Sequence, residues 1–129
     1  MAYDYDDGNI FAKILRGEIP CKKVDESEHS LAFHDINPQA PTHVLVIPKG
    51  RYVDYAHFAA EASEPEIADF TRLVGKVAAT LGHVPGEGGG GFRILANAGR
   101  DAHQEVPHLH VHLFAGGFLG RMIQVPDGG

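Results

Sequence analysis

The sequence predicts an α+β domain in which a five-stranded antiparallel sheet carries one long helix and one or two short helices. Two observations lead to this prediction. Five short runs with strand character follow one another in a mostly sequential order, and one long amphipathic helical pattern interrupts them near the middle of the chain. Strands that follow one another closely tend to pair as neighbours, which favours an antiparallel arrangement.

A short helix and a β-hairpin open the chain. Residues 9–20 (NIFAKILRGEIP) place apolar side chains at helical spacing, and Gly17 and Pro20 then act as stop signals. Residues 22–27 (KKVDES) and 30–36 (SLAFHDI) are two short runs on either side of a polar turn. That pattern predicts two paired strands.

A third strand and the long helix follow. Residues 43–49 (HVLVIPK) are rich in β-branched side chains, which favour strands. In residues 64–81, apolar side chains recur at steps of three and four, so one face of the helix is apolar. Ser63 and Glu66 have the spacing of a capping box, and Gly82 is a stop signal. We expect the apolar face to pack against the sheet.

Two more strands complete the predicted sheet. Residues 86–91 (GEGGGG) predict a flexible loop, while residues 92–97 (FRILAN) and 108–114 (HLHVHLF) predict the fourth and fifth strands. The sequence contains neither internal repeats nor a recognisable linker. Residues 1–129 are therefore expected to form a single domain, with a core from about residue 9 to about residue 117.

Composition limits the classes of function. The chain has a formal net charge of −6, whereas proteins that bind nucleic acid need clustered Lys and Arg. No apolar run reaches the ~20 residues of a membrane span, and the acidic start MAYDYDDGNI is unlike a secretory signal. The single cysteine, Cys21, cannot form an internal disulfide and is expected to be a small buried residue. We expect a cytoplasmic protein that binds neither nucleic acid nor membranes.

Three histidines alternate along the fifth predicted strand. His108, His110 and His112 occupy every second position, so their imidazoles share one face while the intervening apolar residues face the core. The Cα atoms of His108 and His112 would lie about 13 Å apart at roughly 3.3 Å per residue. Zinc ligands converge at about 2 Å from the ion, so one metal held by all three is disfavoured. A row of imidazoles instead suits attack on an extended anion, with neighbours donating to it.

The run HLHVHLF fits the His-φ-His-φ-His-φ-φ signature of the histidine-triad (HIT) superfamily, where φ is an apolar residue. Residues 32–49 (AFHDINPQAPTHVLVIPK) and 97–112 (NAGRDAHQEVPHLHVH) resemble the corresponding stretches of its Hint branch, the histidine-triad nucleotide-binding proteins, in their prokaryotic form. The likeness runs from about Asn9 to about Gly117. It implies a HIT-like fold and a homodimer in which two sheets form one ten-stranded sheet.

The resemblance also implies a reaction. In the family the middle histidine, here His110, attacks the α-phosphate of a nucleotide conjugate, expels an amine or other leaving group, and forms a nucleotidyl-histidine that water hydrolyses. The backbone carbonyl of His108 would hold the second ring nitrogen of His110, and His112 would donate to a phosphate oxygen. His43 matches a fourth histidine that supports the triad. The resemblance thus predicts a purine nucleoside phosphoramidase that acts on AMP or GMP conjugates.

A nucleotide pocket is implied as well. Asp35 matches the carboxylate that accepts both ribose hydroxyls. Asn97 matches an amide at the phosphate site, with a plain turn residue as the alternative, and Ile14 fits either the pocket or the core. The remaining implied positions belong to the base pocket or to the turn whose backbone N–H groups face the phosphate: Ile10, Phe11, Phe33, His34, Ile36, Gln104, Glu105 and Val106.

Some positions depart from the family pattern. Glu105 stands where eukaryotic members commonly have a serine that assists the leaving amine, so it would act as an acid or line the mouth of the site. Pro107 replaces an aromatic residue and His103 a glycine, which predicts a different shape for the loop before the triad. Residues 9–14 (NIFAKI) lack the Cys-x-x-Cys that helps to hold zinc in some relatives, so we expect no metal or other cofactor. The tail from residue 116 onward has its own sequence.

Three other functions stay open on sequence alone. A dinucleoside polyphosphate hydrolase of the fragile-histidine-triad type is the nearest alternative, but that branch usually has glutamine at the position of Asn97. A nucleotide-binding scaffold with incidental hydrolysis would use the same pocket. A metal-dependent hydrolase is the third alternative.

Overall fold

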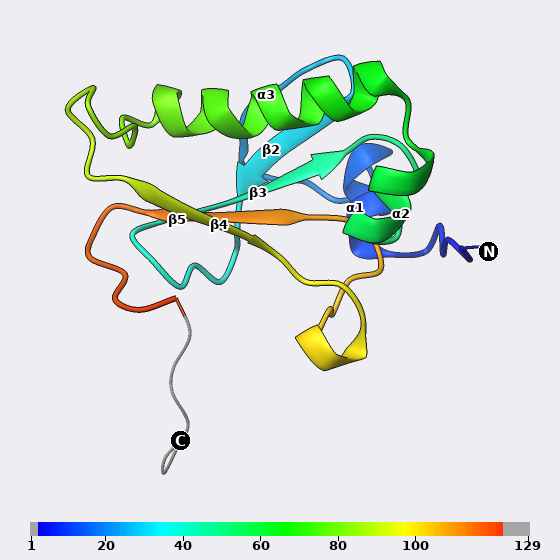
Figure 1. The fold of residues 1–129 in the computed structure, drawn as a ribbon. Helices are drawn as coiled ribbons and strands as arrows, with labels where there is room; N and C mark the ends of the chain where they lie inside the picture. The colour runs from blue at the N-terminus through cyan, green and yellow to red at the C-terminus, as the bar shows by residue number, and fades with distance from the viewer. Residues whose placement is uncertain (1–2, 123–129) are drawn as a thin grey trace, which may run out of the picture.

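The predicted sheet forms the centre of the molecule (Figure 1). The computed structural model describes residues 3–122, and their five strands pair antiparallel throughout, in the order β1-β2-β3-β5-β4. The strands are β1 (Lys23–Glu26), β2 (Ser30–His34), β3 (Thr42–Pro48), β4 (Phe92–Ala96) and β5 (Val111–Ala115). This confirms the α+β class and the five-stranded antiparallel sheet.

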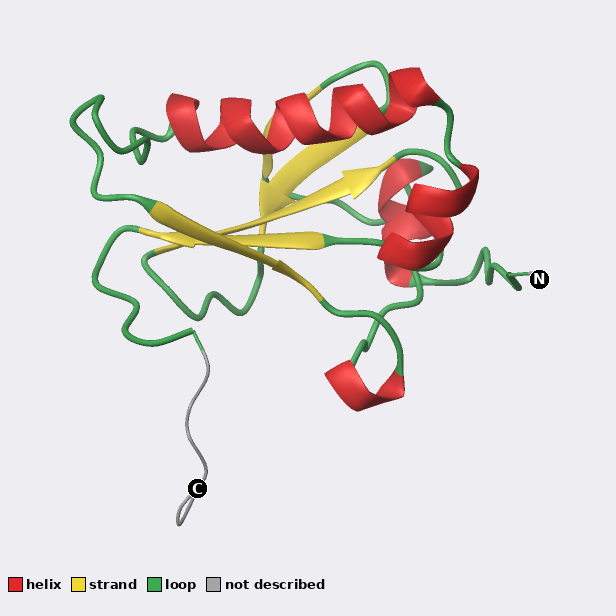
Figure 2. Cartoon of the chain, in the orientation of Figure 1, coloured by secondary structure: helices red, strands yellow, loops and turns green. Residues whose placement is uncertain are grey.

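The long helix and the first short helix lie where the sequence predicts them (Figure 2). α3 (Glu64–Thr80) begins with a complete capping box. The hydroxyl of Ser63 accepts the backbone N–H of Glu66, and the carboxylate of Glu66 accepts the backbone N–H of Ser63. α1 (Ile10–Leu15) is capped by Asn9, whose side-chain oxygen accepts a backbone N–H of the first turn. Both caps satisfy donors that the helix itself leaves unpaired.

A second short helix was not located by the sequence pattern. α2 (Tyr55–Glu61) begins at Asp54, whose carboxylate accepts the backbone N–H of His57. Seven residues give too few positions for a helical period to stand out, although His57 and Phe58 are buried. A single 3₁₀ turn, η1 (Arg100–Ala102), lies in the loop before the triad. None of the described helices combines the length and the apolar character needed to cross a membrane.

The sheet separates two apolar clusters. α3 covers one face, as the apolar stripe predicts (Figure 1). The cluster beneath it contains Ala32, Val44, Val46, Phe70, Leu73, Val77, Leu109, Val111 and Leu113, among others. The opposite face carries α1 and a smaller cluster of Phe11, Leu31, Phe33, Leu45 and Ile47. Because β2 and β3 alternate between the two clusters, the α1 face has an apolar floor beside the histidines.

The fifth strand is shorter than predicted and contains only the last of the three histidines, His112. The sequence predicts a strand over residues 108–114, but β5 begins at Val111, where its pairing with both β3 and β4 stops. The lead-in before it is held differently, since the backbone N–H of Leu109 donates to the carbonyl of Tyr52 at 2.8 Å. The alternation nevertheless holds, because Leu109 and Val111 are both buried under α3.

Candidate active site

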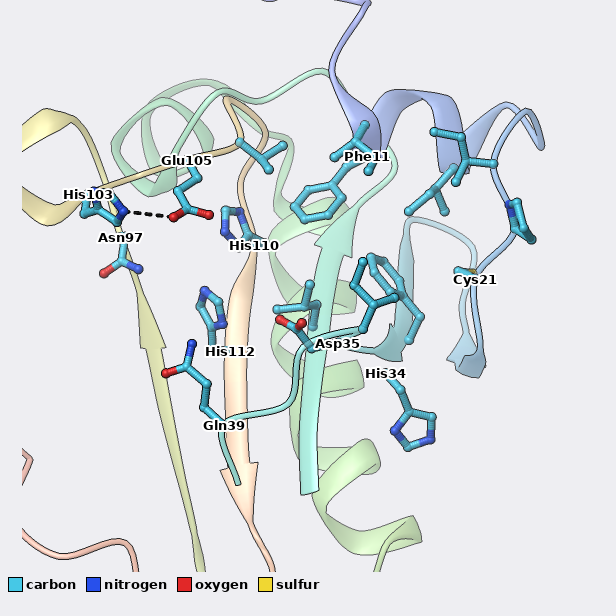
Figure 3. Close-up of a pocket in the computed structure, with 18 residues that line it drawn as sticks. Phe11, Cys21, His34, Asp35, Gln39, Asn97, His103, Glu105, His110 and His112 are labelled. Carbon is cyan, nitrogen blue, oxygen red and sulfur yellow. Dashed lines mark hydrogen bonds and ion pairs between the residues drawn. The ribbon is translucent and has the colours of Figure 1, made fainter. Parts of the chain in front are cut away.

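A cavity of about 370 Å³ opens on the α1 face, between α1, the end of β2 and the segment before β5 (Figure 3). Twelve of the residues that line it belong to the implied nucleotide pocket: Ile10, Phe11, Ile14, Phe33, His34, Asp35, Ile36, Asn97, Glu105, Val106, His110 and His112. The sequence did not indicate six others: Ile19, Pro20, Cys21, Gln39, Leu45 and His103. The cavity therefore joins an apolar end near α1 to a polar end at the histidines.

His110 lies in this cavity with one ring nitrogen already engaged. Its Nδ1 lies 2.8 Å from the backbone carbonyl oxygen of His108, and a carbonyl can only accept, so Nδ1 carries the proton. The Nε2 atom of the neutral ring is then the unprotonated nitrogen. Burial lowers the pKa of His110 below its usual 6.5, which favours that neutral form. The residue has the protonation state that a nucleophile needs.

A chain of hydrogen bonds also assigns the protons of His112. The backbone N–H of Gln39 donates to Nδ1 of His43 at 3.1 Å, so the neutral His43 ring carries its proton on Nε2. That Nε2 lies 2.9 Å from Nδ1 of His112 and donates to it. His112 must then carry its own proton on Nε2. Burial lowers the pKa of His43, and burial together with the neighbouring imidazoles lowers that of His112 to about 4, so both rings stay neutral.

His108 lies outside the cavity and is fully buried. Its Nε2 donates to the carbonyl of Pro48 at 2.8 Å, and its Nδ1 lies beside the hydroxyl of Tyr5. Burial lowers the pKa of His108 to about 4. The first histidine of the triad is thus a neutral structural residue, and its backbone carbonyl is the part that reaches His110.

Asp35 brings a carboxylate to the edge of the cavity, just beyond the end of β2 (Figure 3). Its Oδ1 accepts the backbone N–H of Asn37 at 2.8 Å, which fixes the side chain. Its Oδ2 lies 3.4 Å from Nε2 of His43. An ionised carboxylate has about four lone-pair sites, so Asp35 can still accept hydroxyl groups from a ligand.

With this geometry in view, comparison with known proteins identifies the family. A model of the HIT domain matches residues 16–118. The chain belongs to the HIT domain family. It is 64% identical to a 13.2 kDa HIT-like protein of Azospirillum brasilense, over 95% of this chain and 98% of that one. It is 42% identical to a 14 kDa zinc-binding protein of Zea mays, over 95% of this chain and 90% of the relative.

Solved structures agree with this assignment. A HIT family hydrolase from Clostridium thermocellum is 35% identical, with a TM-score of 0.78 over 92% of this chain and 99% of that one. A histidine triad nucleotide-binding protein from Candida albicans is 33% identical, with a TM-score of 0.71 over 93% of this chain and 87% of its own. The HIT-like fold expected from the sequence is confirmed.

One cluster of side chains in this HIT domain could in principle bind a metal ion. Within the described residues, Asp35, His43 and His112 are the group whose potential ligand atoms all lie within 4.8 Å of one another. A metal at this point would need the lone pair of His43 Nε2, which moves the proton of the neutral ring to Nδ1. That proton would face the backbone N–H of Gln39, which also only donates. The donor set therefore fits a chain of protons better than a metal ion.

In the loop before the triad of this HIT domain, the polar groups of Gln104 bond to the backbone. Gln104 is not among the lining residues, because its backbone N–H donates to the carbonyl of Gly99. Its side-chain amide donates to the carbonyls of Val53 at 2.7 Å and Val106 at 3.0 Å, and its Oε1 accepts the N–H of Gly99. Gln104 therefore holds the loop and has no backbone donor to offer to a phosphate.

The rim of the cavity carries His103 and Glu105, two of the positions at which the sequence analysis expects a departure from the family. His103 has φ of 57°, in the left-handed region where glycine is favoured, so its side chain projects from a turn shaped for glycine. Its Nε2 lies 2.8 Å from Oε1 of Glu105 (Figure 3). Both side chains are exposed. The loop thus presents an imidazole and a carboxylate as a pair at the mouth.

Three further positions can now be placed in the HIT domain. Ile14 lines the cavity and also packs on the Phe11 cluster, so both of its expected roles apply. Cys21, expected to be buried, is half-buried and lines the cavity, and burial raises the pKa of its thiol. Ile36 is 85% exposed at the lip. Of the tail that departs from the family, residues 123–129 lie outside the described residues.

Proposed function

We propose that this HIT domain is a Hint-type hydrolase, a purine nucleoside phosphoramidase that releases AMP or GMP from amine conjugates through a nucleotidyl-His110 intermediate. One observation carries the proposal. The 2.8 Å bond from His110 Nδ1 to the carbonyl of His108 leaves Nε2 unprotonated in a residue that lines the cavity. The names of two structural relatives, a hydrolase and a nucleotide-binding protein, support the class.

The first step forms a bond from His110 Nε2 to the α-phosphorus while the bond from phosphorus to the leaving nitrogen breaks. The leaving nitrogen takes up a proton and departs as an amine. His110 then carries a positive charge, because Nδ1 keeps its proton, and the carbonyl of His108 stabilises that charge. In the second step a water oxygen bonds to phosphorus, the nitrogen–phosphorus bond breaks, and the water loses a proton. Nucleoside monophosphate leaves and His110 is neutral again.

His112 is proposed to bind the oxygens of the transferred phosphate. With Nδ1 accepting from His43, its Nε2–H is the group left to donate to a ligand. The ring lines the cavity beside His110, with ring centroids 5.0 Å apart. A donor fixed before the reaction stabilises negative charge as it develops, without reorganisation during the reaction.

The nucleoside is proposed to occupy the other end of the cavity. The rings of Phe11 and Phe33 meet edge to face at 5.7 Å, and Ile10 and Ile14 lie beside them among the lining residues. These side chains offer apolar surface to a flat purine base. Asp35, between this end and the histidines, would accept the ribose hydroxyls. The order base, ribose, phosphate then matches the order of residues from α1 to β5.

The leaving group is proposed to lie at the rim, beside the pair of His103 and Glu105. In its ionised form Glu105 provides negative charge there, which favours a leaving amine that takes up a further proton after it departs. It is also a candidate for the acid that the leaving nitrogen needs, when protonated. His103 and Glu105 are both positions at which the sequence analysis expects a departure from the family, so the pair bears on the choice of amine.

A homodimer is proposed on the basis of the free sheet edge. β4 is the last strand in the sheet order, so one side of its backbone has no strand partner within the described chain. Three large apolar residues of β4, Phe92, Ile94 and Leu95, are between 37% and 50% exposed. Proteins rarely leave a long apolar edge strand uncovered. A second copy that pairs along β4 would give the ten-stranded sheet implied by the resemblance.

The test is a product assay on adenosine and guanosine 5′-phosphoramidates. Wild-type protein should release AMP and GMP, and His110→Ala should lower kcat by about 10³-fold or more, because the nucleophile is lost. His29→Ala, which changes a histidine in the β1–β2 turn, is the matched control and should keep wild-type rates. Activity retained in the His110 variant would refute the mechanism. Faster turnover of a diadenosine polyphosphate would favour the dinucleoside polyphosphate hydrolase instead.

A further inference from the structure

The hydroxyl of Tyr5 lies 2.5 Å from Nδ1 of His108, across 103 positions of sequence. Nε2 of the same ring faces the carbonyl of Pro48 at 2.8 Å. Since a carbonyl can only accept, Nε2 carries the proton and Nδ1 carries the lone pair. The phenol of Tyr5 must therefore be the donor in this contact. Both nitrogens of a fully buried imidazole are satisfied in this way, one by the N-terminal segment and one by the end of β3.

Neither partner in this contact gains or loses a proton at neutral pH. Burial lowers the pKa of His108 to about 4, so the ring does not gain a second proton there. Burial also raises the pKa of the Tyr5 phenol, so the hydroxyl keeps the proton that it donates. The contact has no titrating partner in the range where the enzyme would work.

The N-terminal segment is held by several further contacts that bring Tyr5 to His108. The ring of Tyr3 stacks on His57 of α2 at 4.1 Å between centroids. The guanidinium of Arg51 donates to both carboxylate oxygens of Asp7 and lies 5.1 Å from the centre of the Tyr5 ring. These contacts attach the segment to α2 and to the chain after β3.

His108 contacts the proposed nucleophile, His110, directly. The backbone carbonyl of His108 is the acceptor that holds Nδ1 of His110. The direction of that carbonyl depends on the backbone of His108, whose ring is fixed at both nitrogens. Without the Tyr5 hydroxyl, a buried nitrogen lacks its donor, and the ring gains by turning or shifting toward another one. A shift of the ring that carries the backbone of His108 with it would turn this carbonyl and move the imidazole of His110, against the backbone bonds of His108 to Val106 and of Leu109 to Tyr52.

We propose that Tyr5 is a positioning residue for the reaction, whose hydroxyl fixes His108 and thereby the orientation and tautomer of the nucleophile His110. The proposal rests on the proposed function of His110. It assigns a role in the chemistry to an N-terminal segment that lies outside the residues matched by the family model, which begin at residue 16.

The experiment compares Tyr5→Phe with the matched control Tyr3→Phe, a tyrosine of the same segment that stacks on His57. Steady-state kinetics on adenosine 5′-phosphoramidate would be combined with ¹⁵N spectra of the histidine rings and with Tm. We expect Tyr5→Phe to lower kcat on the order of ten-fold, because small misplacement of a reacting group is costly, with little change in KM. The Nδ1 resonance of His108 should move toward that of a nitrogen without a donor, and the His110 resonances should shift with it. Tyr3→Phe should match wild type in kcat and in the histidine resonances.

Unchanged kcat in Tyr5→Phe would overturn the proposal, even if Tm fell, because that result describes a purely structural contact. Unshifted His110 resonances would overturn it as well. The spectra need no turnover, so they still decide on Tyr5 if the wild-type protein fails to cleave the phosphoramidate. That failure would count against the proposed function, while shifted His108 and His110 resonances would support the positioning role.

Discussion

At the scale of single residues, two fixed backbone groups determine where the protons of His110 and His112 lie. The carbonyl of His108 places a proton on Nδ1 of His110, and the N–H of Gln39, acting through His43, places one on Nε2 of His112. The Nε2 atom of His110 therefore offers a lone pair to a ligand, whereas the Nε2 atom of His112 offers a proton to donate. In the proposed reaction, identical side chains thus act as a nucleophile and as a charge-stabilising donor.

These protonation states predict the pH dependence of activity. Burial lowers the pKa of His110 below 6.5 and, with neighbouring imidazoles, that of His112 to about 4. The proposed mechanism uses the neutral rings, so kcat/KM should stay on its plateau as the pH falls through 6.5 and decline only at lower pH. A pH–rate profile with phosphoramidate substrate checks this. An acid limb centred at or above pH 6.5 would contradict it.

The same shifts predict how stability depends on pH. His108, with a pKa of about 4 in the folded protein against 6.5 as its ordinary value, is the strongest case. Between these two values the unfolded chain binds more protons than the folded chain, so the free energy of unfolding falls as the pH falls through that window. Urea titrations at a series of pH values measure it. Stability that is level from pH 6.5 to pH 4 would contradict the neutral, buried His108.

Sequence and structure agree on some residues and differ on others for identifiable reasons. The alternating histidines and Asp35 were predictable, because a two-residue period and a motif carry them. Tyr5 and Gln39 were not, because each acts through a contact with a residue that no local pattern links to it. Gln104 was assigned to the phosphate turn, whereas its amide and its N–H are used within the loop.

At the scale of elements, the loop before β5 decides where the polar end of the cavity lies. Gln104 ties this loop to itself at Gly99 and Val106, and to the segment before α2 at Val53. Glu105 and His110 follow shortly after it in the chain. The side chain of Gln104 bonds to three backbone groups and so stabilises a loop in which Gly99 and His103 have positive φ.

Replacing Gln104 by alanine should loosen this loop. Three side-chain bonds to the backbone are lost, so we expect a loss of about 1–3 kcal/mol in the free energy of unfolding, together with lower activity. Urea denaturation measures the first effect, and faster amide exchange across residues 99–106 locates it. Arg100→Ala, at a fully exposed side chain of the same loop, is the control and should change little. Wild-type exchange in the Gln104 variant would show that another contact holds the loop.

Element boundaries were harder to predict than element types. α3 followed from its capping box and its apolar stripe, both of which are local signals. The start of β5 depends on where β3 and β4 stop pairing with it, which is set by tertiary structure rather than by the histidine repeat. α2 is stabilised chiefly by burial of His57 and Phe58, and a segment of its length shows little periodicity.

At the scale of the whole molecule, the order of strands explains how the site is assembled. β5 lies between β3 and β4, so the triad is flanked by His43 on one side and by the end of β4, with Asn97, on the other. The sequence predicted five antiparallel strands but not this order. β4 and β5 pair across a 14-residue loop, and β3 and β5 pair over a still longer separation that local pattern does not encode.

The free edge of β4 predicts the oligomeric state. Wild-type protein should sediment as a dimer, and Ile94→Lys should shift it toward monomer by placing a charge on the exposed apolar face of the edge strand. Tyr55→Lys, at a similarly exposed residue of α2, is the control and should remain dimeric. Analytical ultracentrifugation distinguishes the species. A monomeric wild-type protein at micromolar concentration would remove the dimer from the account.

The covalent intermediate tests the central claim most directly. Protein mixed with an adenosine phosphoramidate, quenched within a turnover and digested, should yield one peptide whose mass has increased by an adenylyl group, with fragmentation placing that group on His110. The His110→Ala protein should show no such adduct. An adduct on another residue, or rapid turnover with no adduct at any quench time, would contradict the mechanism.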